Sequence, residues 1–160
     1  MRDRLIDRMV QVFGQDQKRI DHAMAVLELA ERIQAAEGAD PAVVQAAAIL
    51  HDIGIHQAQL KYNSTAGIYQ QIEGPPIARS ILEGLGWPAE QIDHVCKIIA
   101  SHHTADLIDT PELRCVWDAD WIVNLGTDYA SWPIEAKRHT VAVVLRTETG
   151  RQIARSRYLG

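Results

Sequence analysis

The sequence predicts an all-α protein, a single-domain helical bundle over residues 1–160 with its core at about 17–147. Apolar residues recur at three- and four-residue steps along most of the chain, which is the pattern of amphipathic helices. No alternation of apolar and polar residues continues long enough to predict a strand. A chain of 160 residues fits one domain with one core, and no segment resembles a linker between domains.

The first expected helix covers about residues 17–37. Gly38 follows it and is typical of the residue that ends a helix, because glycine adopts a left-handed conformation without strain. The apolar positions fall on one face of this helix, which we expect to be buried: Ile20, Ala23, Met24, Leu27, Ala30 and Ile33.

A second helix is expected to begin at Asp40-Pro41, because Asp is a favoured N-cap and Pro fits the first helical position. It runs through AVVQAAAIL to His51-Asp52, and Gly54 marks its end or a bend. This helix is apolar nearly all round, which predicts a central, buried position.

The helical pattern weakens from residue 57 to residue 72. The stretch KYNSTAG within it contains residues that favour turns, so we expect a mobile loop over a site. A helix is expected to restart at Gly74-Pro75-Pro76 and to run to about Gly84.

Turn residues separate the remaining helices. Gly86-Trp87-Pro88 precedes a helix of about residues 89–102, and Thr110-Pro111 opens another that reaches Val123. A last helix is expected over about residues 133–147, followed by a tail that frays or packs elsewhere.

Composition narrows the classes of partner. The net charge is -5 and the 16 basic residues are scattered, so we expect no binding to a nucleic acid polymer. No apolar run is long enough to cross a membrane and the N-terminus lacks a secretory signal, so we expect a cytoplasmic protein. Cys96 and Cys115 form no CxxC pair and are expected to be reduced, buried thiols.

Four ionisable residues lie in otherwise apolar helical stretches: His22, His51, Asp52 and Asp120. Burying such groups costs free energy unless they are paired or bind a metal. Each residue, taken singly, is better explained as a hydrogen-bonded core histidine or a surface aspartate. A shared divalent cation such as Mn, Fe, Zn or Ni explains all four together.

These residues carry a resemblance to a known family. His22, the HDIG sequence of residues 51–54 and Ala119-Asp120 follow the H…HD…D signature of the HD-domain superfamily of metal-dependent phosphohydrolases. The neighbouring sequences KRIDHAMAVLELAERI, AAAILHDIGI and DADWIVNL are also similar to that family. The resemblance extends from about Arg19 to Leu125 and implies a helical bundle with a metal in its interior.

The resemblance implies that His22, His51, Asp52 and Asp120 are the ligands of a first metal ion. Asp118 is the local alternative to Asp120. Asp120 is favoured because the family has an alanine directly before the liganding aspartate.

A second metal ion is implied by the resemblance to binuclear members of the superfamily, in which Asp52 would bridge two ions. His102 and His103 occupy the region where those members place further histidine ligands. Adjacent side chains on a helix point about 100° apart, so both can face one small site only if the helix ends or bends there.

One ligand position of the binuclear relatives is changed in this chain. Those relatives have a histidine where this sequence has Gln70, Gln71 and Glu73. Glu73 is expected either to replace that histidine as a ligand or base, or to be a carboxylate favoured near a helix N-terminus.

Phosphate groups also need cationic side chains. Lys61 and Arg79 are the best candidates for substrate binding, with Arg19 a third, although each also fits an ordinary surface charge.

The expected activity is hydrolysis of a small phosphomonoester or nucleotide by water activated on one or two ions of Mn, Fe, Ni, Co, Zn or Mg. Asp52 or Glu73 would accept the proton. Ile55 instead of lysine after HDIG, and HHT instead of an HHE…GYP pattern, disfavour cleavage of cyclic dinucleotides.

Two other functions stay open, a di-iron oxygenase and a non-catalytic sensor of metal or nucleotide. The sequence leaves a homodimer open too, and it does not identify the substrate or the native metal.

Overall fold

In residues 1–104 and 108–160, which the computed structural model describes, all regular secondary structure is helical, as predicted. Seven helices form the larger part of the described chain: α1 (Arg2–Phe13), α2 (Gln17–Glu37), α3 (Pro41–Leu50), α4 (Ile55–Tyr62), α5 (Gly67–Gly84), α6 (Ala89–Ser101) and α7 (Pro111–Leu125). The C-terminal part contains α8 (Ile134–His139) and α9 (Glu148–Ala154), each continued by a π-helical turn, η1 (Thr140–Val144) and η2 (Arg155–Leu159).

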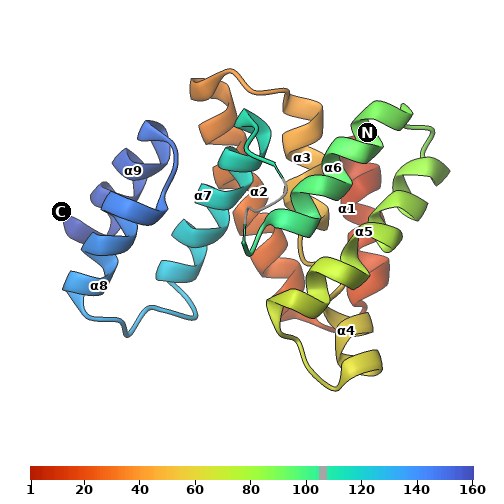
Figure 1. The fold of residues 1–160 in the computed structure, drawn as a ribbon, viewed down its shortest axis with the longest axis horizontal. Coiled ribbons are helices and arrows are strands. Elements are labelled where there is room, and N and C mark those ends of the chain that lie inside the picture. The colour runs from red at the N-terminus through yellow and green to blue at the C-terminus, as the bar shows by residue number, and fades with distance from the viewer. Residues whose placement is uncertain (105–107) are drawn as a thin grey trace.

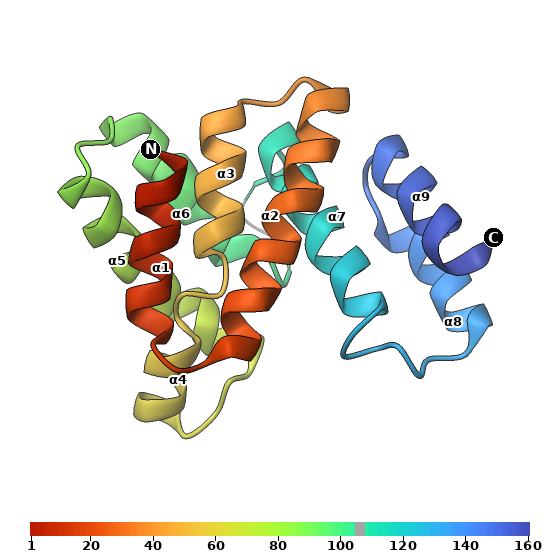
Figure 2. The same ribbon diagram turned by 180° about the vertical axis from the view of Figure 1, so that it is seen from behind.

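Helix α3 lies at the centre of the bundle, as its apolar sequence predicts. It packs against α1, α2, α6 and α7, and seven of its ten residues are buried. Its start is fixed by Asp40, whose carboxylate accepts hydrogen bonds from the backbone of Ala42 and Val43. Figure 2 shows α3 between α1 and α2. The end of α3 is therefore held deep within the molecule.

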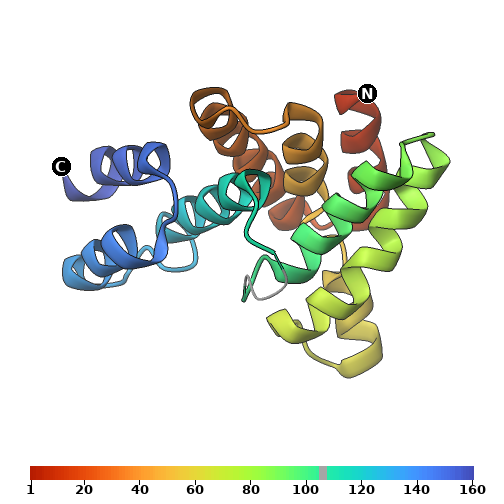
Figure 3. The same cartoon turned by 45° about the horizontal axis from the view of Figure 1, so that its top comes forward.

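The other helices are arranged along one long axis of the molecule. Helices α5 and α6 pack together at one end, and α7 lies along α2 (Figure 1). Helices α8 and α9 lie beyond α7 at the opposite end, an arrangement that Figure 3 shows from above. One continuous apolar core includes residues of α1, α2, α3, α5, α6, α7 and α9.

The loop expected at KYNSTAG, residues 61–67, is shorter than expected, and the weak helical pattern around it, residues 57–72, is mostly helix. Helix α4 already occupies Ile55–Tyr62, and α5 begins at Gly67, so only a short turn separates them. Asn63 ends α4 in a left-handed conformation with a φ of 53°. Buried Ile55 and Ala58 anchor α4, because tertiary packing outweighs the weak helical pattern.

The expected helix start at Gly74-Pro75-Pro76 is also wrong, because α5 continues through both prolines to its predicted end at Gly84. A proline inside a helix removes one backbone hydrogen bond and crowds the preceding turn. The packing of α5 along α6 compensates for this local cost.

Both ends of the chain are more ordered than the sequence suggested. No helix was predicted at the N-terminus, yet α1 buries Leu5, Met9 and Phe13 on one face. The helix expected over residues 133–147 ends early, since Leu145 is extended and Thr147 caps α9. The tail from residue 151 is helical and not frayed.

None of the helices in the described residues combines the length and the apolar character that a bilayer crossing needs.

A close approach of two glycines joins the end of α3 to α5. A Cβ atom added to Gly54 would lie 2.5 Å from the backbone nitrogen of Gly74 and 3.0 Å from the carbonyl oxygen of Gln70. Both contacts are with backbone, which cannot rotate away as a side chain can. The glycine of the HDIG sequence is therefore required by packing between the turn after α3 and α5.

Replacing Gly54 with alanine is expected to lower the free energy of unfolding by about 2 kcal/mol or more, because a well-packed backbone must move. Gly84→Ala is the matched control, since nothing lies within 4 Å of the added Cβ, and it is expected to be neutral or slightly stabilising. Urea denaturation measures both variants. Equal stability of the two variants would contradict the packing argument.

Candidate metal centre

His51 and Asp52 lie in the turn that directly follows α3, and both are buried. The Nδ1 atom of His51 is 2.7 Å from the carbonyl oxygen of Ala48. A carbonyl oxygen only accepts hydrogen bonds, so the ring proton of neutral His51 is at Nδ1. Its Nε2 atom therefore directs a lone pair toward the centre of the cluster.

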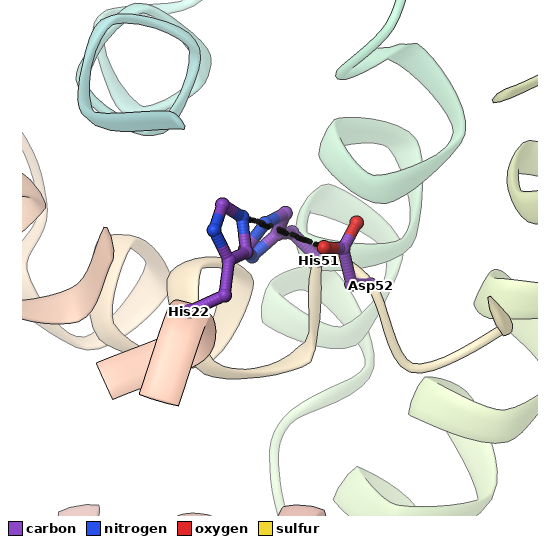
Figure 4. Close-up of side chains that lie close together, drawn as sticks. All are labelled: His22, His51 and Asp52. Carbon is purple, nitrogen blue, oxygen red and sulfur yellow. Dashed lines mark hydrogen bonds and ion pairs between the residues drawn. The ribbon is translucent and has the colours of Figure 1, made fainter. Parts of the chain in front are cut away.

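His22 from α2 and Asp120 from α7 complete the first group. The Nε2 atom of His22 is 2.9 Å from Oδ1 of Asp120 and 3.3 Å from Nε2 of His51. The Oδ2 atom of Asp52 is 3.3 Å from His51 Nε2 and 3.5 Å from His22 Nε2. Figure 4 shows the side chains of His22, His51 and Asp52 directed toward one another. Three helices thus bring together the four residues that the H…HD…D pattern singles out.

A second group shares Asp52 with the first. His102 follows the end of α6, its Nδ1 atom is 2.8 Å from the carbonyl oxygen of Ile99, and its Nε2 atom is 3.4 Å from Oδ1 of Asp52. His103 lies beside it with ring centroids 3.9 Å apart. Because α6 ends at Ser101, both rings approach the same site, as the sequence analysis required. The ligand-type atoms of Asp52, His102 and His103 all lie within 4.8 Å of one another.

Gln70 faces this second group. Its Oε1 atom is 3.2 Å from Nε2 of His103, and its amide nitrogen donates to the carbonyl oxygen of Thr65. From the sequence, Gln70 was noted only as a departure from the family pattern, with no role. Its spacing of one helical turn from Gly74 is the signal that could have suggested that it faces the site.

The donor set fits a divalent cation. His22 and His51 direct ring nitrogens at each other at 3.3 Å, a repulsive arrangement unless a proton or a cation lies between them. Within the described residues, the buried Nε2 atom of His102 lies 3.4 Å from Oδ1 of Asp52 but forms no hydrogen bond of good geometry. Imidazole nitrogens oriented by backbone carbonyls, together with carboxylates, are the ligands that divalent transition metals prefer.

The electrostatics of the metal-free cluster also favour a cation. Burial by itself would lower the pKa of His51, but Asp52 and Asp120 outweigh it and raise that pKa well above its usual value. Burial would raise the pKa of Asp52 and of Asp120, yet the neighbouring histidines lower both below the usual value. The carboxylates are therefore ionised, and a bound metal would compete with a proton for His51.

His103 differs from His51. Desolvation, followed by repulsion from His102, lowers its pKa to about 4. The ring is therefore neutral near pH 7 and able to donate a lone pair.

Asp118 and Asp120 point to opposite sides of α7. The carboxylate of Asp118 is fully buried and accepts hydrogen bonds from the backbone of Arg146 and Thr147 and from the Thr147 hydroxyl. Asp118 thus binds the segment before α9, whereas Asp120 faces the histidines. The geometry favours Asp120 over Asp118 as the ligand.

The structure does not bring Glu73, Lys61 or Arg79 to the cluster. The carboxylate of Glu73 is 3.6 Å from Nζ of Lys61 and 3.4 Å from the hydroxyl of Tyr62. Arg79 is paired with Asp93 at 2.6 Å. None of the three expected residues lines the cavity at the cluster, because Glu73 and Lys61 pair with each other between α5 and α4 and Arg79 pairs with Asp93.

A cavity of about 670 Å³ opens onto the cluster. His22, Asp52, His103 and Asp120 contribute to its wall. Arg19, the third candidate for phosphate binding, also lines the cavity. Further lining residues had no site role predicted from the sequence, among them Lys18, Gln70, Asn124, Thr127, Asp128 and Tyr129. Several of these come from the turn after α7, whose position beside α2 no local sequence pattern indicates.

Comparisons with known proteins agree with this arrangement. The model of the HD domain family matches residues 19–125. A crystal structure from an uncultured Thermotogales bacterium, described as a predicted HD superfamily hydrolase, is 25% identical with a TM-score of 0.72. That match covers 97% of this chain and 83% of the other. No curated protein matches the chain significantly.

Two substitutions on α7 test the ligand assignment. Asp120→Asn is expected to weaken Mn²⁺ binding at least about tenfold, because an ionised ligand is lost. Asp118→Asn is expected to bind Mn²⁺ normally but to unfold at a lower urea concentration, since an amide donor then faces two backbone N–H groups. Calorimetric titration of EDTA-treated protein with Mn²⁺ distinguishes them, and loss of binding only in Asp118→Asn would reverse the assignment.

Proposed function

This chain belongs to the HD-domain family, and we propose that it is a metal-dependent phosphohydrolase acting on small phosphomonoesters, nucleotides among them. The observation that carries the proposal is the pair of ligand groups that share Asp52 at the wall of a cavity. The likeness to a predicted HD superfamily hydrolase supports the class of reaction.

In this proposal His22, His51, Asp52 and Asp120 hold one divalent ion, and Asp52, His102 and His103 provide for a second. Such an ion supplies Lewis acidity, which lowers the pKa of water and stabilises charge on the phosphate oxygens. The native ion is one of Mn, Fe, Ni, Co, Zn or Mg. Gln70 orients His103 through the contact between its amide oxygen and the ring.

The reaction is hydrolysis by in-line attack. The oxygen of a water molecule forms a bond to phosphorus, the bond from phosphorus to the leaving oxygen breaks, and an alcohol and inorganic phosphate are released. Asp52, an ionised carboxylate at the cavity wall, would accept a proton from the water, and the leaving oxygen takes up a proton to be released as the alcohol. Glu73 is not used, since Lys61 and Tyr62 engage its carboxylate.

Arg19 is the cation that we assign to the substrate phosphate. It lies on α2 three residues before His22, so the two side chains share one face of the helix. Both line the cavity, whereas Lys61 and Arg79 do not. A guanidinium group next to the ligand cluster can form paired hydrogen bonds with phosphate oxygens.

A di-iron oxygenase is the second candidate, because two adjacent ligand groups that share a carboxylate also suit two irons. Metal analysis of aerobically purified protein separates the two functions. Two irons and a product that depends on oxygen would favour the oxygenase.

Release of phosphate from a panel of phosphorylated metabolites with Mn²⁺, Co²⁺, Ni²⁺ or Mg²⁺ supports the phosphohydrolase. Failure to release phosphate from any of them, with metal or nucleotide binding retained, would favour a sensor.

Asp52→Ala is expected to reduce metal-dependent phosphate release by more than about a hundredfold, since even residues outside the ligand set commonly cost 10–100-fold at metal sites. The helical circular dichroism spectrum should be retained. Asp93→Ala, which alters an exposed aspartate paired with Arg79, is the control and should keep normal activity. An Asp52→Ala protein with normal turnover would refute the proposed chemistry.

Arg19→Gln is expected to raise KM by about tenfold, because a charged hydrogen bond to phosphate contributes about 1.5–3 kcal/mol. Arg79→Gln is the matched control, since Arg79 lies outside the cavity, and its KM should be unchanged. Steady-state kinetics on the best substrate of the panel measures both. The assignment of Arg19 fails if Arg79→Gln shows the larger effect.

A further inference from the structure

An aromatic residue forms part of the cavity wall near the candidate metal centre. Tyr129, in the turn after α7, lines the same cavity as His22 and Asp52. Its ring stacks on Trp132 with centroids 4.3 Å apart and an interplanar angle of 23°, and Trp121 lies 5.7 Å away. The two tryptophans do not line the cavity. Tyr129 therefore stands between the cavity and a support of two indole rings.

The turn that carries Tyr129 is held in place from several directions. The backbone nitrogen of Tyr129 donates to the carbonyl oxygen of Asn124 at 2.8 Å, and Trp132 donates to the carbonyl of Tyr129 at 3.0 Å. Lys137 donates to the carbonyl oxygen of Ala130 at 2.9 Å, and Lys18 on α2 pairs with Asp128 at 3.7 Å. Because the ring is already oriented, the stacking of a ligand on it costs the protein little conformational entropy.

The size and lining of the cavity indicate a substrate larger than phosphate alone. Its volume of about 670 Å³ is typical of sites that enclose a whole small molecule. Asn124, Thr127 and Asp128 line the cavity together with Tyr129, so hydrogen-bonding groups border the aromatic surface. An aromatic platform with polar neighbours is suited to a flat ring with nitrogen and oxygen atoms on its edge.

We infer that Tyr129 selects phosphomonoesters whose leaving group carries a flat heteroaromatic ring. The ring stacks on Tyr129 while the phosphate lies at the cluster of His22, Asp52 and Asp120. This inference rests on the proposed phosphohydrolase function and assigns its substrate class. Tyr129 contacts the leaving group only, so it acts on specificity and not on the bond that breaks.

Substrates with the same reacting group test this inference. Adenosine 5′-monophosphate and uridine 5′-monophosphate share a ribose 5′-phosphate with ribose 5-phosphate, which lacks the base, so intrinsic reactivity is matched. The wild-type kcat/KM is expected to be at least about tenfold higher for the two nucleotides, a size typical of stacking on an aromatic side chain. Tyr129→Leu is expected to lower the kcat/KM for the two nucleotides to that for ribose 5-phosphate, whereas Tyr129→Phe keeps the preference.

Tyr69→Leu is the matched control. Tyr69 also belongs to a stacked aromatic pair, with Tyr62 at 4.2 Å, but does not line the cavity, so the nucleotide preference should persist. Circular dichroism and the turnover of ribose 5-phosphate show whether each variant is folded.

The outcomes separate the two levels of the proposal. Equal wild-type kcat/KM values for nucleotides and ribose 5-phosphate would overturn the role of Tyr129 and leave the phosphohydrolase intact. If none of the three compounds is hydrolysed, calorimetric binding of adenosine 5′-monophosphate in the presence of Mn²⁺ decides the inference. Binding about tenfold weaker in Tyr129→Leu than in Tyr129→Phe supports it, and equal binding, or none in the wild type, overturns it.

Discussion

Two imidazole nitrogens, His22 Nε2 and His51 Nε2, face each other 3.3 Å apart between the carboxylates of Asp52 and Asp120. Such a group of buried polar atoms is tolerated only where its charges are balanced. Three helices contribute to it, so its geometry depends on how α2, α3 and α7 pack. The burial of α3 delivers His51 and Asp52 to this point, and the contact of α2 with α7 places His22 against Asp120.

The requirement that these side chains meet also accounts for the contacts on both sides of the cluster. Helix α7 presents Asp120 to the histidines and Asp118 to the backbone before α9, so one short segment serves the candidate site and the C-terminal part. On the other side, the contact between Gly54 and Gly74 holds α5 close to the turn that carries Asp52. Gln70, one turn before Gly74 on α5, is thereby brought within 3.2 Å of His103.

The elements that could be predicted have strong local signals. The apolar periodicity of α2 and the Asp-Pro start of α3 placed both helices correctly, and the ordered His and Asp residues identified the cluster. The elements that were missed depend on distant partners. The helical pattern is weak over residues 57–72, yet residues 57–62 and 67–72 are helical because buried Ile55 and Ala58 anchor α4 and α5 packs against α6. The side chains of Glu73, Lys61 and Arg79 have chemistry that suits the predicted roles. The sequence does not show that Glu73 contacts Tyr62 and Lys61, or that Arg79 pairs with Asp93.

The sequence by itself determined the all-helical class, indicated the HD-domain family through its resemblance to the H…HD…D signature, and singled out His22, His51, Asp52 and Asp120. It could do so because helical periodicity and caps are local properties, and because buried charges in apolar helices are conspicuous. Only the tertiary structure decided which side chains surround the cavity, among them Arg19, Gln70 and Tyr129. It also favoured Asp120 over Asp118, which are two residues apart on one helix. The physical reason is that the direction of a side chain relative to a site depends on how helices pack, and packing joins residues that are far apart in the chain.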